Sequence, residues 1–276
     1  MDTAFLEQLF GLEGQVAVVT GGGGVLCGAM ARALARVGAC VAVLDLNVTA
    51  AQAIASEITA AGGEALAAQT NVLERTSLER ALAAILERWG RLDILVNGAG
   101  GNRAQATTSA ELSFFDLPEE AFREVLSLNL LGTVLPCQVF GRQMAAQGGG
   151  VILNIASVNG FRPLTEIPAY STAKAAVSNF TQWLAVHMAR HYSPRIRVNA
   201  LAPGFVLTEQ NRYLLIDVDG RLTPRAQAAL AHTPLGRFGL PEDLLGAALW
   251  LVSPAAAFVQ GTVVAVDGGF LAYGGV

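Results

Sequence analysis

Two residues four positions apart, Tyr170 and Lys174, could together move a proton to or from a substrate. Residues at i and i+4 share one face of a helix, so the ammonium would lie beside the phenol. A free tyrosine titrates near about 10, and a neighbouring cation lowers that pKa by stabilising the phenolate. Ser157, upstream of the pair, could hydrogen-bond the same substrate oxygen. The pattern indicates acid–base chemistry on a carbonyl or an alcohol. The alternative is a solvated surface pair.

The composition predicts a globular protein with a large core. The chain has 276 residues, of which 53% are hydrophobic and 14% charged, and its mean hydropathy is +0.45. Such an apolar chain should also form apolar subunit interfaces. The net charge of −4 and the lack of a long basic run argue against nucleic-acid partners and against adhesion to anionic membranes.

Neither a membrane span nor a disulfide framework is expected. The uncharged stretch Gly14–Ala31 is interrupted by four consecutive glycines and is followed at once by Arg32, so it does not resemble a spanning helix. The three cysteines, Cys27, Cys40 and Cys137, are odd in number and lack metal-ligand spacing. They predict reduced thiols in a cytoplasmic protein without a metal site.

Short apolar runs alternate with helical patterns along the chain, which is typical of buried parallel strands and their crossover helices. The predicted strands are Val16–Thr20, Cys40–Leu44, Glu64–Gln69, Leu92–Asn97, Val151–Ala156, Ile196–Ala200 and Thr262–Val266. Helices are expected near 26–38, 48–61, 74–89, 118–147, 168–191 and 241–252, with a kink at Pro136. Since no linker or repeat divides residues 1–276, we expect a single-domain α/β Rossmann fold. Its doubly wound seven-stranded parallel sheet should carry helices on both faces.

The longest irregular stretch, Phe205–Leu240, should be an insertion of short helices at the carboxyl edge of the sheet. Insertions at this edge often act as lids over a substrate, so a lid is predicted at about 205–240.

The first predicted strand runs into a glycine-rich turn, Gly21–Gly24, that precedes a helix. Glycines allow a pyrophosphate to approach the backbone, and the helix N-terminus supplies N–H donors. Asp45, at the end of the second strand, could accept hydrogen bonds from the ribose hydroxyls of NAD and would repel the 2′-phosphate of NADP. NAD is therefore favoured over NADP. The alternatives are an ordinary turn and a carboxylate that only caps the next helix.

Asn71, after the third predicted strand, could contact the adenine amino group, or it could be a simple strand-end asparagine. The three histidines show no metal-site spacing and receive no role.

Together these residues resemble the short-chain dehydrogenase/reductase family over nearly the whole chain. Thr20-Gly21 opens a loop similar to the family's nucleotide loop. Further matching segments are Asn97-Gly98-Ala99-Gly100, Asn199-Ala-Leu-Ala-Pro203-Gly204 and Val266-Asp267-Gly268-Gly269. The residues that match the family's catalytic tetrad are Asn129, Ser157, Tyr170 and Lys174.

The resemblance implies hydride transfer to or from the nicotinamide, with Tyr170 as proton donor or base. Lys174 would lower the tyrosine pKa and hold the nicotinamide ribose, Ser157 would orient the substrate oxygen, and Asn129 would hold a water. The cofactor-binding residues implied are Gly21, Gly24, Val25, Leu26, Asp45, Leu46, Asn71, Val72, Asn97, Gly98, Ala99, Tyr170, Lys174, Pro203, Gly204 and Val206.

The nucleotide loop departs from the family pattern. Val25 and Cys27 stand where the family usually has its second and third glycines, although Gly24 and Gly28 lie one place away. A thiol at a helix N-terminus could have a lowered pKa and be reactive, or it could be a small apolar residue packed on the sheet.

Narrower segments resemble a bacterial branch of the family assigned as D-mannonate oxidoreductase, or fructuronate reductase. They are Gly21–Leu26, Asn97–Arg103, Phe161–Leu164, Ser178–His187 and Leu207–Arg212. Enzymes of this branch interconvert a keto-hexuronate and a sugar acid. Arg103, Arg162 and Arg212, with Ser157, are then the candidate substrate residues, because a guanidinium pairs with a carboxylate through two hydrogen bonds. Glu166 could instead neutralise Arg162.

The resemblance also implies a homotetramer. Two other functions stay open at this point. One is a different sugar, polyol or 3-oxoacyl reductase, which Asp45 disfavours in the last case because such enzymes commonly use NADPH. The other is a non-catalytic NAD-binding protein, which the intact tetrad disfavours.

Overall fold

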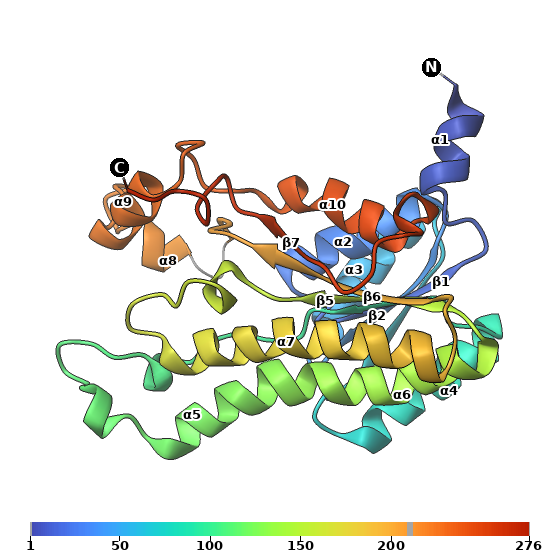
Figure 1. Ribbon diagram of the computed structural model, residues 1–276, viewed down its shortest axis with the longest axis horizontal. Coiled ribbons are helices and arrows are strands. Elements are labelled where there is room, and N and C mark those ends of the chain that lie inside the picture. Colours follow the sequence, from blue (N-terminus) through green and yellow to red (C-terminus); the bar gives the residue numbers. More distant parts are fainter. Residues whose placement is uncertain (1, 209–211, 276) are drawn as a thin grey trace.

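A computed structural model of the chain describes residues 2–208 and 212–275. All seven named strands lie in one parallel sheet with the order β3-β2-β1-β4-β5-β6-β7 (Figure 1). The strands are β1 (Val16–Thr20), β2 (Cys40–Asp45), β3 (Ala65–Gln69), β4 (Ile94–Asn97), β5 (Gly150–Ile155), β6 (Ile196–Pro203) and β7 (Val263–Val266). The predicted single-domain Rossmann fold is confirmed.

Helices cover both faces of the sheet. One face carries α2 (Val25–Arg36), α3 (Val48–Ala60) and α10 (Leu245–Val252), which follows a 3₁₀ turn at Pro241–Leu244. The other carries α4 (Arg75–Trp89), α6 (Gly132–Gln147) and α7 (Pro168–His191). The continuous apolar strands follow from this arrangement: Ala17 and Val19 of β1 enter one core, and Val16 and Val18 enter the other.

The long helix predicted over 118–147 has three parts. They are α5 (Glu119–Leu126), a π-helical turn at Ser127–Leu131, and α6. The α-helix continues through Pro136, so the change in helical geometry lies upstream of the proline on which the predicted kink was placed. The carbonyl of Gly132, four residues before Pro136, cannot receive the usual N–H, and the π turn ends directly before it.

Among the described residues, the stretch Glu119–Gln147 is long and apolar enough to cross a membrane by length and composition. It packs instead in the helix layer beside α4 and α7, and half of its most apolar window is buried within the molecule. A helix packed in a protein core passes the same test of length and composition, so this stretch is only weak evidence for a membrane span.

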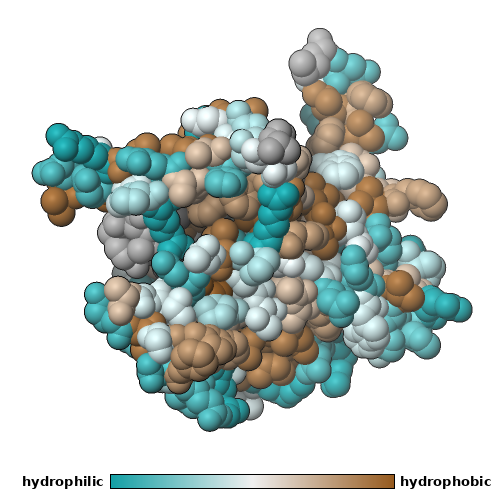
Figure 2. Space-filling model, turned by 60° about the vertical axis from the view of Figure 1, so that its left-hand side comes forward, coloured by the Kyte–Doolittle hydropathy of each residue, from teal (hydrophilic) through white to brown (hydrophobic). Residues whose placement is uncertain are grey.

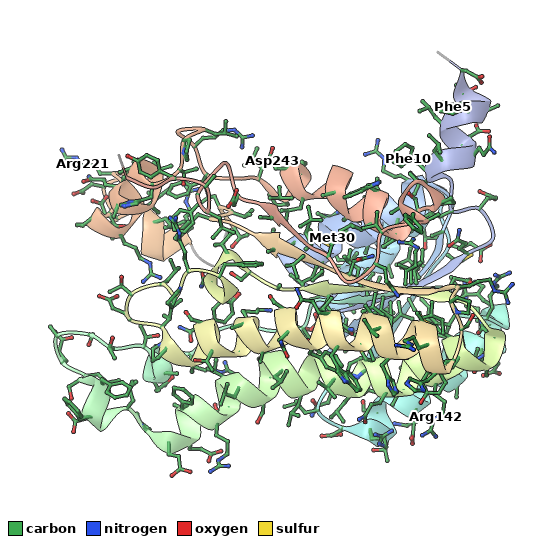
Figure 3. All side chains as sticks on the ribbon, in the orientation of Figure 1. Phe5, Phe10, Met30, Arg142, Arg221 and Asp243 are labelled. Atoms are coloured by element: carbon green, nitrogen blue, oxygen red, sulfur yellow. The ribbon has the colours of Figure 1, made fainter. Side chains whose placement is uncertain are left out.

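The first helix, α1 (Thr3–Phe10), was not predicted. Asp2 caps it by accepting a hydrogen bond from the backbone of Phe5, and none of its residues is buried. It stands away from the body of the protein, with Phe5 in solvent (Figures 1 and 3). Eight residues without an apolar core contact carry little sequence signal for a helix.

The order of the strands reverses between β1 and β4, and ligands of such sheets bind at the carboxyl edge beside this point. That edge lies at the left of Figure 1, with α8 (Arg212–Leu215), α9 (Pro224–Ala231) and the C-terminal segment above it. Figure 2 turns this side forward and shows hydrophobic residues in a hollow between more hydrophilic rims.

Candidate active site

Ser157, Tyr170 and Lys174 meet at the carboxyl end of β5. Ser157 follows this strand, and the other two lie on the first turns of α7. Ser157 lies close enough to Tyr170 to act on the tyrosine pKa, and the Lys174 ammonium lies 5.6 Å from the centre of the tyrosine ring. Lys174 is only 5% exposed and donates a 2.7 Å hydrogen bond to the carbonyl of Ile155. Lys174 is therefore buried and Tyr170 half-buried, so the alternative of a solvated surface pair is wrong.

Burial controls the titration of both groups. It raises the pKa of Tyr170 above its ordinary value, and the interaction with Ser157 only partly opposes this. The lowering of the tyrosine pKa expected from Lys174 does not decide the net direction, because desolvation of the phenolate is the larger effect. Desolvation also lowers the pKa of Lys174 to about 8, because the ammonium has left water for a nearly dry site. At neutral pH the phenol is protonated and can donate.

Asn129 lies in the π-helical turn and is fully buried. Its amide donates to the carbonyls of Val125 (2.8 Å) and Gly101 (2.7 Å), and its side-chain oxygen accepts from the backbone of Gly101 (3.1 Å). Gly100 must be small, because a Cβ built there lies 2.6 Å from the Asn129 oxygen and 3.5 Å from the Lys174 nitrogen. The asparagine thus fixes the loop after β4, and Gly100 of this loop lies beside the buried lysine.

The glycine turn after β1 is closely packed against the neighbouring strands. Gly21 has a φ of +63°, and a Cβ built on it lies 2.9 Å from the backbone of Ala99. Gly24 is the N-cap of α2 and bonds back to Gly21. The turn therefore brings bare backbone and a helix N-terminus to the switch point of the sheet, which is the cradle that a pyrophosphate requires.

Asp45 faces this turn from the end of β2. Its two carboxylate oxygens accept from the backbone N–H groups of Gly23 (3.0 Å) and Asn47 (2.9 Å). The cap of α3 is Asn47, whose side chain accepts from Ala50. The carboxylate is not the helix cap, and it lies where a dinucleotide would present its ribose. The residues present fit a dinucleotide cofactor.

The other predicted cofactor residues also lie along this edge. Leu46 (64% exposed) and Val25 (40% exposed) are open apolar side chains next to Asp45 and Gly24, Leu26 is half-buried, and Val72 is buried. Asn71 bonds locally, since its amide donates to Glu74 and its oxygen accepts from Leu73. The adenine contact proposed for Asn71 would need these bonds to rearrange.

Two strand ends complete the cofactor edge. Asn97 donates from its buried side chain to Asn154 (2.9 Å) and to the Cys137 sulfur (3.1 Å), so it joins β4 to β5 instead of pointing out of the sheet. Pro203 ends β6, and Gly204 follows it with no room for a side chain, because a built Cβ lies 2.6 Å from the backbone of Asp267. Val206 is buried and bridges to Gly239.

The predicted substrate arginines do not meet at one point, unlike Ser157, Tyr170 and Lys174. Arg103 is 59% exposed and lies 3.9 Å from Glu124. Arg162 donates to the carbonyls of Tyr273 (2.8 Å) and Phe270 (3.3 Å) in the C-terminal segment. Arg212 begins α8 and is exposed, and residues 209–211 before it lie outside the described residues. Glu166 does not neutralise Arg162, because it pairs with Arg225 at 3.7 Å.

A model of the family described as short chain dehydrogenase matches residues 15–218. The chain belongs to the short-chain dehydrogenase/reductase family. It is therefore an oxidoreductase acting on CH–OH groups with a nicotinamide cofactor.

Individual relatives of this short-chain dehydrogenase cover almost the whole chain. An uncharacterized oxidoreductase, UxuB, of Bacillus subtilis is 50% identical over 274 residues, which are 96% of this chain and 98% of the relative. The 7alpha-hydroxysteroid dehydrogenase of Escherichia coli K12 is 34% identical, with 94% of each chain covered. A Haemophilus influenza crystal structure with bound NAD, provisionally assigned as a D-mannonate oxidoreductase, has 48% identity and a TM-score of 0.92. It covers 96% of this chain and 98% of its own.

Cys27 of this dehydrogenase is 5% exposed, and burial raises its pKa to about 12. The reactive thiol considered from its place at the start of α2 is therefore wrong, because desolvation of the thiolate outweighs the favourable helix dipole. The interpretation as a small packed residue is confirmed.

Some contacts of the site carried no signal in the sequence. The Thr20 hydroxyl accepts from the backbone N–H groups of Gly98 (3.2 Å) and Ala99 (3.4 Å), which fixes the loop after β4 to the glycine turn. The Ile155 carbonyl, which holds Lys174, is backbone and could not be predicted from residue type.

A surface cavity of about 390 Å³ lies between the turn at Phe114–Asp116 and α5. None of the predicted site residues lines it.

Proposed function

We propose that the protein is an NAD-dependent dehydrogenase that interconverts D-mannonate and D-fructuronate, or a closely similar pair of sugar acids. The observation that carries the proposal is the junction of Ser157, Tyr170 and buried Lys174 at the carboxyl edge, beside a glycine turn faced by Asp45. The 48% identical structure that binds NAD and is provisionally assigned to D-mannonate supports the same choice.

The nicotinamide, when bound, supplies or accepts the hydride at the substrate carbon. Tyr170 donates its proton to the ketone oxygen in reduction, and as a phenolate it takes the hydroxyl proton in oxidation. Ser157 holds the same oxygen by a hydrogen bond. Lys174 stabilises the phenolate, and Asn129 fixes the loop after β4 beside the lysine. The raised pKa of Tyr170 favours proton donation at neutral pH.

NAD is proposed as the cofactor because of the surroundings of Asp45. Its carboxylate would accept bonds from the ribose hydroxyls and would repel a 2′-phosphate. The sequence places no lysine or arginine within residues 21–28 or 44–53 to attract that phosphate. The proposed cofactor residues are those expected from the sequence along the ends of β1, β2, β4 and β6.

The substrate carboxylate is proposed to bind Arg162, with Arg103 and Arg212 as further candidates. Arg162 lies five residues after Ser157, and only one of its terminal nitrogens is used by the two C-terminal carbonyls. The rest of its guanidinium can pair with a carboxylate. Residues 205–240 are proposed to close over this substrate as a lid, whose α9 already contacts the loop of Arg162 through Arg225 and Glu166.

A substrate panel tests the proposal. Purified protein is assayed with NAD⁺ and NADP⁺ on D-mannonate, on a neutral hexitol and on a 3-hydroxyacyl thioester, and with NADH on D-fructuronate. The proposal expects the highest kcat/KM with the sugar acid and NAD. Higher activity on the thioester or the hexitol would replace the substrate assignment. Tight NADH binding without turnover on any substrate would revive a non-catalytic role.

The protein is further proposed to be a cytoplasmic homotetramer. Apolar residues exposed on one face of α7, Trp183 and Val186, and Leu131 before α6 support subunit contacts there. Sedimentation velocity tests the assembly, and a monomer at micromolar concentration would contradict it.

A further inference from the structure

A side chain at position 98 has no room, and the obstacle is a sulfur atom. A Cβ built on Gly98 lies 1.9 Å from the Cys27 sulfur, far inside van der Waals contact, but an acceptable 3.4 Å from the Cys27 Cβ. Gly98 does not have a positive φ, so its backbone would accept other residues. Cys27 is thus the main obstacle at this position, and the Thr20 carbonyl oxygen, 3.1 Å from the built Cβ, is the next closest atom.

Close packing on the other side of helix α2 opposes a movement that would relieve that contact. Gly28, next to the cysteine, is packed so closely that a Cβ built on it lies 2.9 Å from the Ile54 side chain. Its N–H donates a 2.7 Å hydrogen bond to Gly24 in the nucleotide turn. A displacement of Cys27 would therefore disturb the turn and α3 together.

The loop after β4 is held on its other sides by the cofactor turn and by the catalytic centre. Thr20 binds its first two N–H groups, and Asn129 binds both backbone groups of Gly101. A side chain at position 98 that displaced this loop would therefore also displace the glycine turn and Asn129. The Cys27 sulfur packs against this loop at Gly98.

We propose that Cys27 is a positioning residue for the nicotinamide cofactor, and that positions 27 and 98 share one side-chain volume. The sulfur fills the space next to Gly98 and thereby determines where the loop after β4 lies relative to Thr20 and Asn129. Only one of the two positions can carry the larger side chain. This inference rests on cofactor binding by the proposed function and is independent of the sugar-acid substrate.

Size-swap variants test the proposal, with NADH fluorescence as the binding assay. Gly98→Ala should weaken NADH binding by about tenfold or more, because overpacking at a fixed site is poorly relieved. Cys27→Ala should weaken it only a few-fold. In the double variant C27A/G98A the new methyl enters the vacated space, so binding should return to within about threefold of Cys27→Ala.

A serine variant separates size from thiol chemistry. Serine keeps an atom at the γ position, so C27S/G98A should bind NADH as weakly as Gly98→Ala alone. Gly141→Ala is the matched glycine control, because a Cβ built there meets its neighbours at an ordinary 3.6 Å or more. It should bind NADH as the wild type does.

Independent effects of the two substitutions, or equal binding by C27A/G98A and C27S/G98A, would overturn the proposal. If Gly98→Ala does not fold, thermal melting gives the same comparison. C27A/G98A should then recover a cooperative transition and C27S/G98A should not, and failure of both doubles to fold would also overturn it. If the wild type itself binds no NADH, the proposed function fails, and melting of the same variants still decides the packing pair.

Discussion

Lys174 is 5% exposed and tied to the Ile155 carbonyl, whereas Arg103 is 59% exposed and its nearest acidic partner is 3.9 Å away. The catalytic candidates stand on a strand end and on the first turns of a long helix. The substrate arginines stand on loops and on the short helix α8. The comparison teaches that regular elements fix the chemistry of this fold, while its loops can vary the substrate.

The largest effect is expected from Tyr170→Phe. Loss of the hydroxyl removes the proton donor, so turnover should fall by roughly 10²–10⁴-fold. NADH binding should stay within about twofold of the wild type, because the ring remains. Steady-state assays and fluorescence titration measure both quantities. Wild-type turnover in this variant would show that Tyr170 is not the proton donor and that the fixed region does not carry the chemistry.

Lys174→Met tests whether the centre is truly buried. The lysine pKa of about 8 lies below its ordinary 10.5, so between these pH values the unfolded chain holds the extra proton. The stability contributed by this group therefore rises with pH across that range, by about 3 kcal/mol.

The difference in unfolding free energy between wild type and Lys174→Met should rise accordingly from pH 8 to 10.5 in urea titrations. Cys137, whose pKa is raised to about 12 by burial and which has no interaction with Lys174, affects both proteins equally and cancels. A constant difference would mean that Lys174 is solvated.

Asp45→Asn tests the cofactor side of the fixed region. The amide keeps the shape but removes the charge, so NADH binding should weaken roughly tenfold while NADPH binding weakens less or improves. Dissociation constants for both cofactors give the ratio. An unchanged ratio would show that Asp45 serves only the backbone of Gly23 and Asn47.

The smallest and most selective effect is expected from the candidate substrate arginines. Arg162→Ala should raise the KM for the sugar acid by about tenfold, because a charge-assisted hydrogen bond is lost. The KM for a neutral hexitol should not change. Arg103→Ala, at a more exposed position, should change either KM less than about threefold. An equal rise for acid and hexitol would mean that Arg162 acts by holding the C-terminal segment.

The sequence predicted the sheet well because its central strands are buried on both faces and are therefore mostly apolar. β6 extends beyond the predicted Ala200 to Pro203, because β7 pairs with it as far as Pro203 opposite Val266. Such an extension depends on a partner strand about sixty residues away. The π turn around Asn129 was hidden because its residues are ordinary helix formers, and the conspicuous Pro136 drew the expected irregularity downstream.

The candidate site was predictable where residue type alone defines a role, as for Tyr170, Lys174 and Asp45. It was not predictable where a side chain has a choice of partners. Arg162 donates to main-chain carbonyls, and Asn97 donates to Asn154 within the sheet. The direction of the tyrosine pKa also depended on burial, which the local sequence does not contain.

The anchoring of the C-terminal segment by Arg162 has a practical consequence for handling the protein. Arg162 holds the carbonyls of Phe270 and Tyr273, and so the C-terminal segment, on the side of the molecule that carries the candidate site. Helix α1 lies on the opposite side (Figure 1). An affinity tag or a surface-immobilisation handle fused after residue 276 would lie beside the carboxyl edge of the sheet, which carries the candidate site. The same handle fused before residue 1 would leave that edge open.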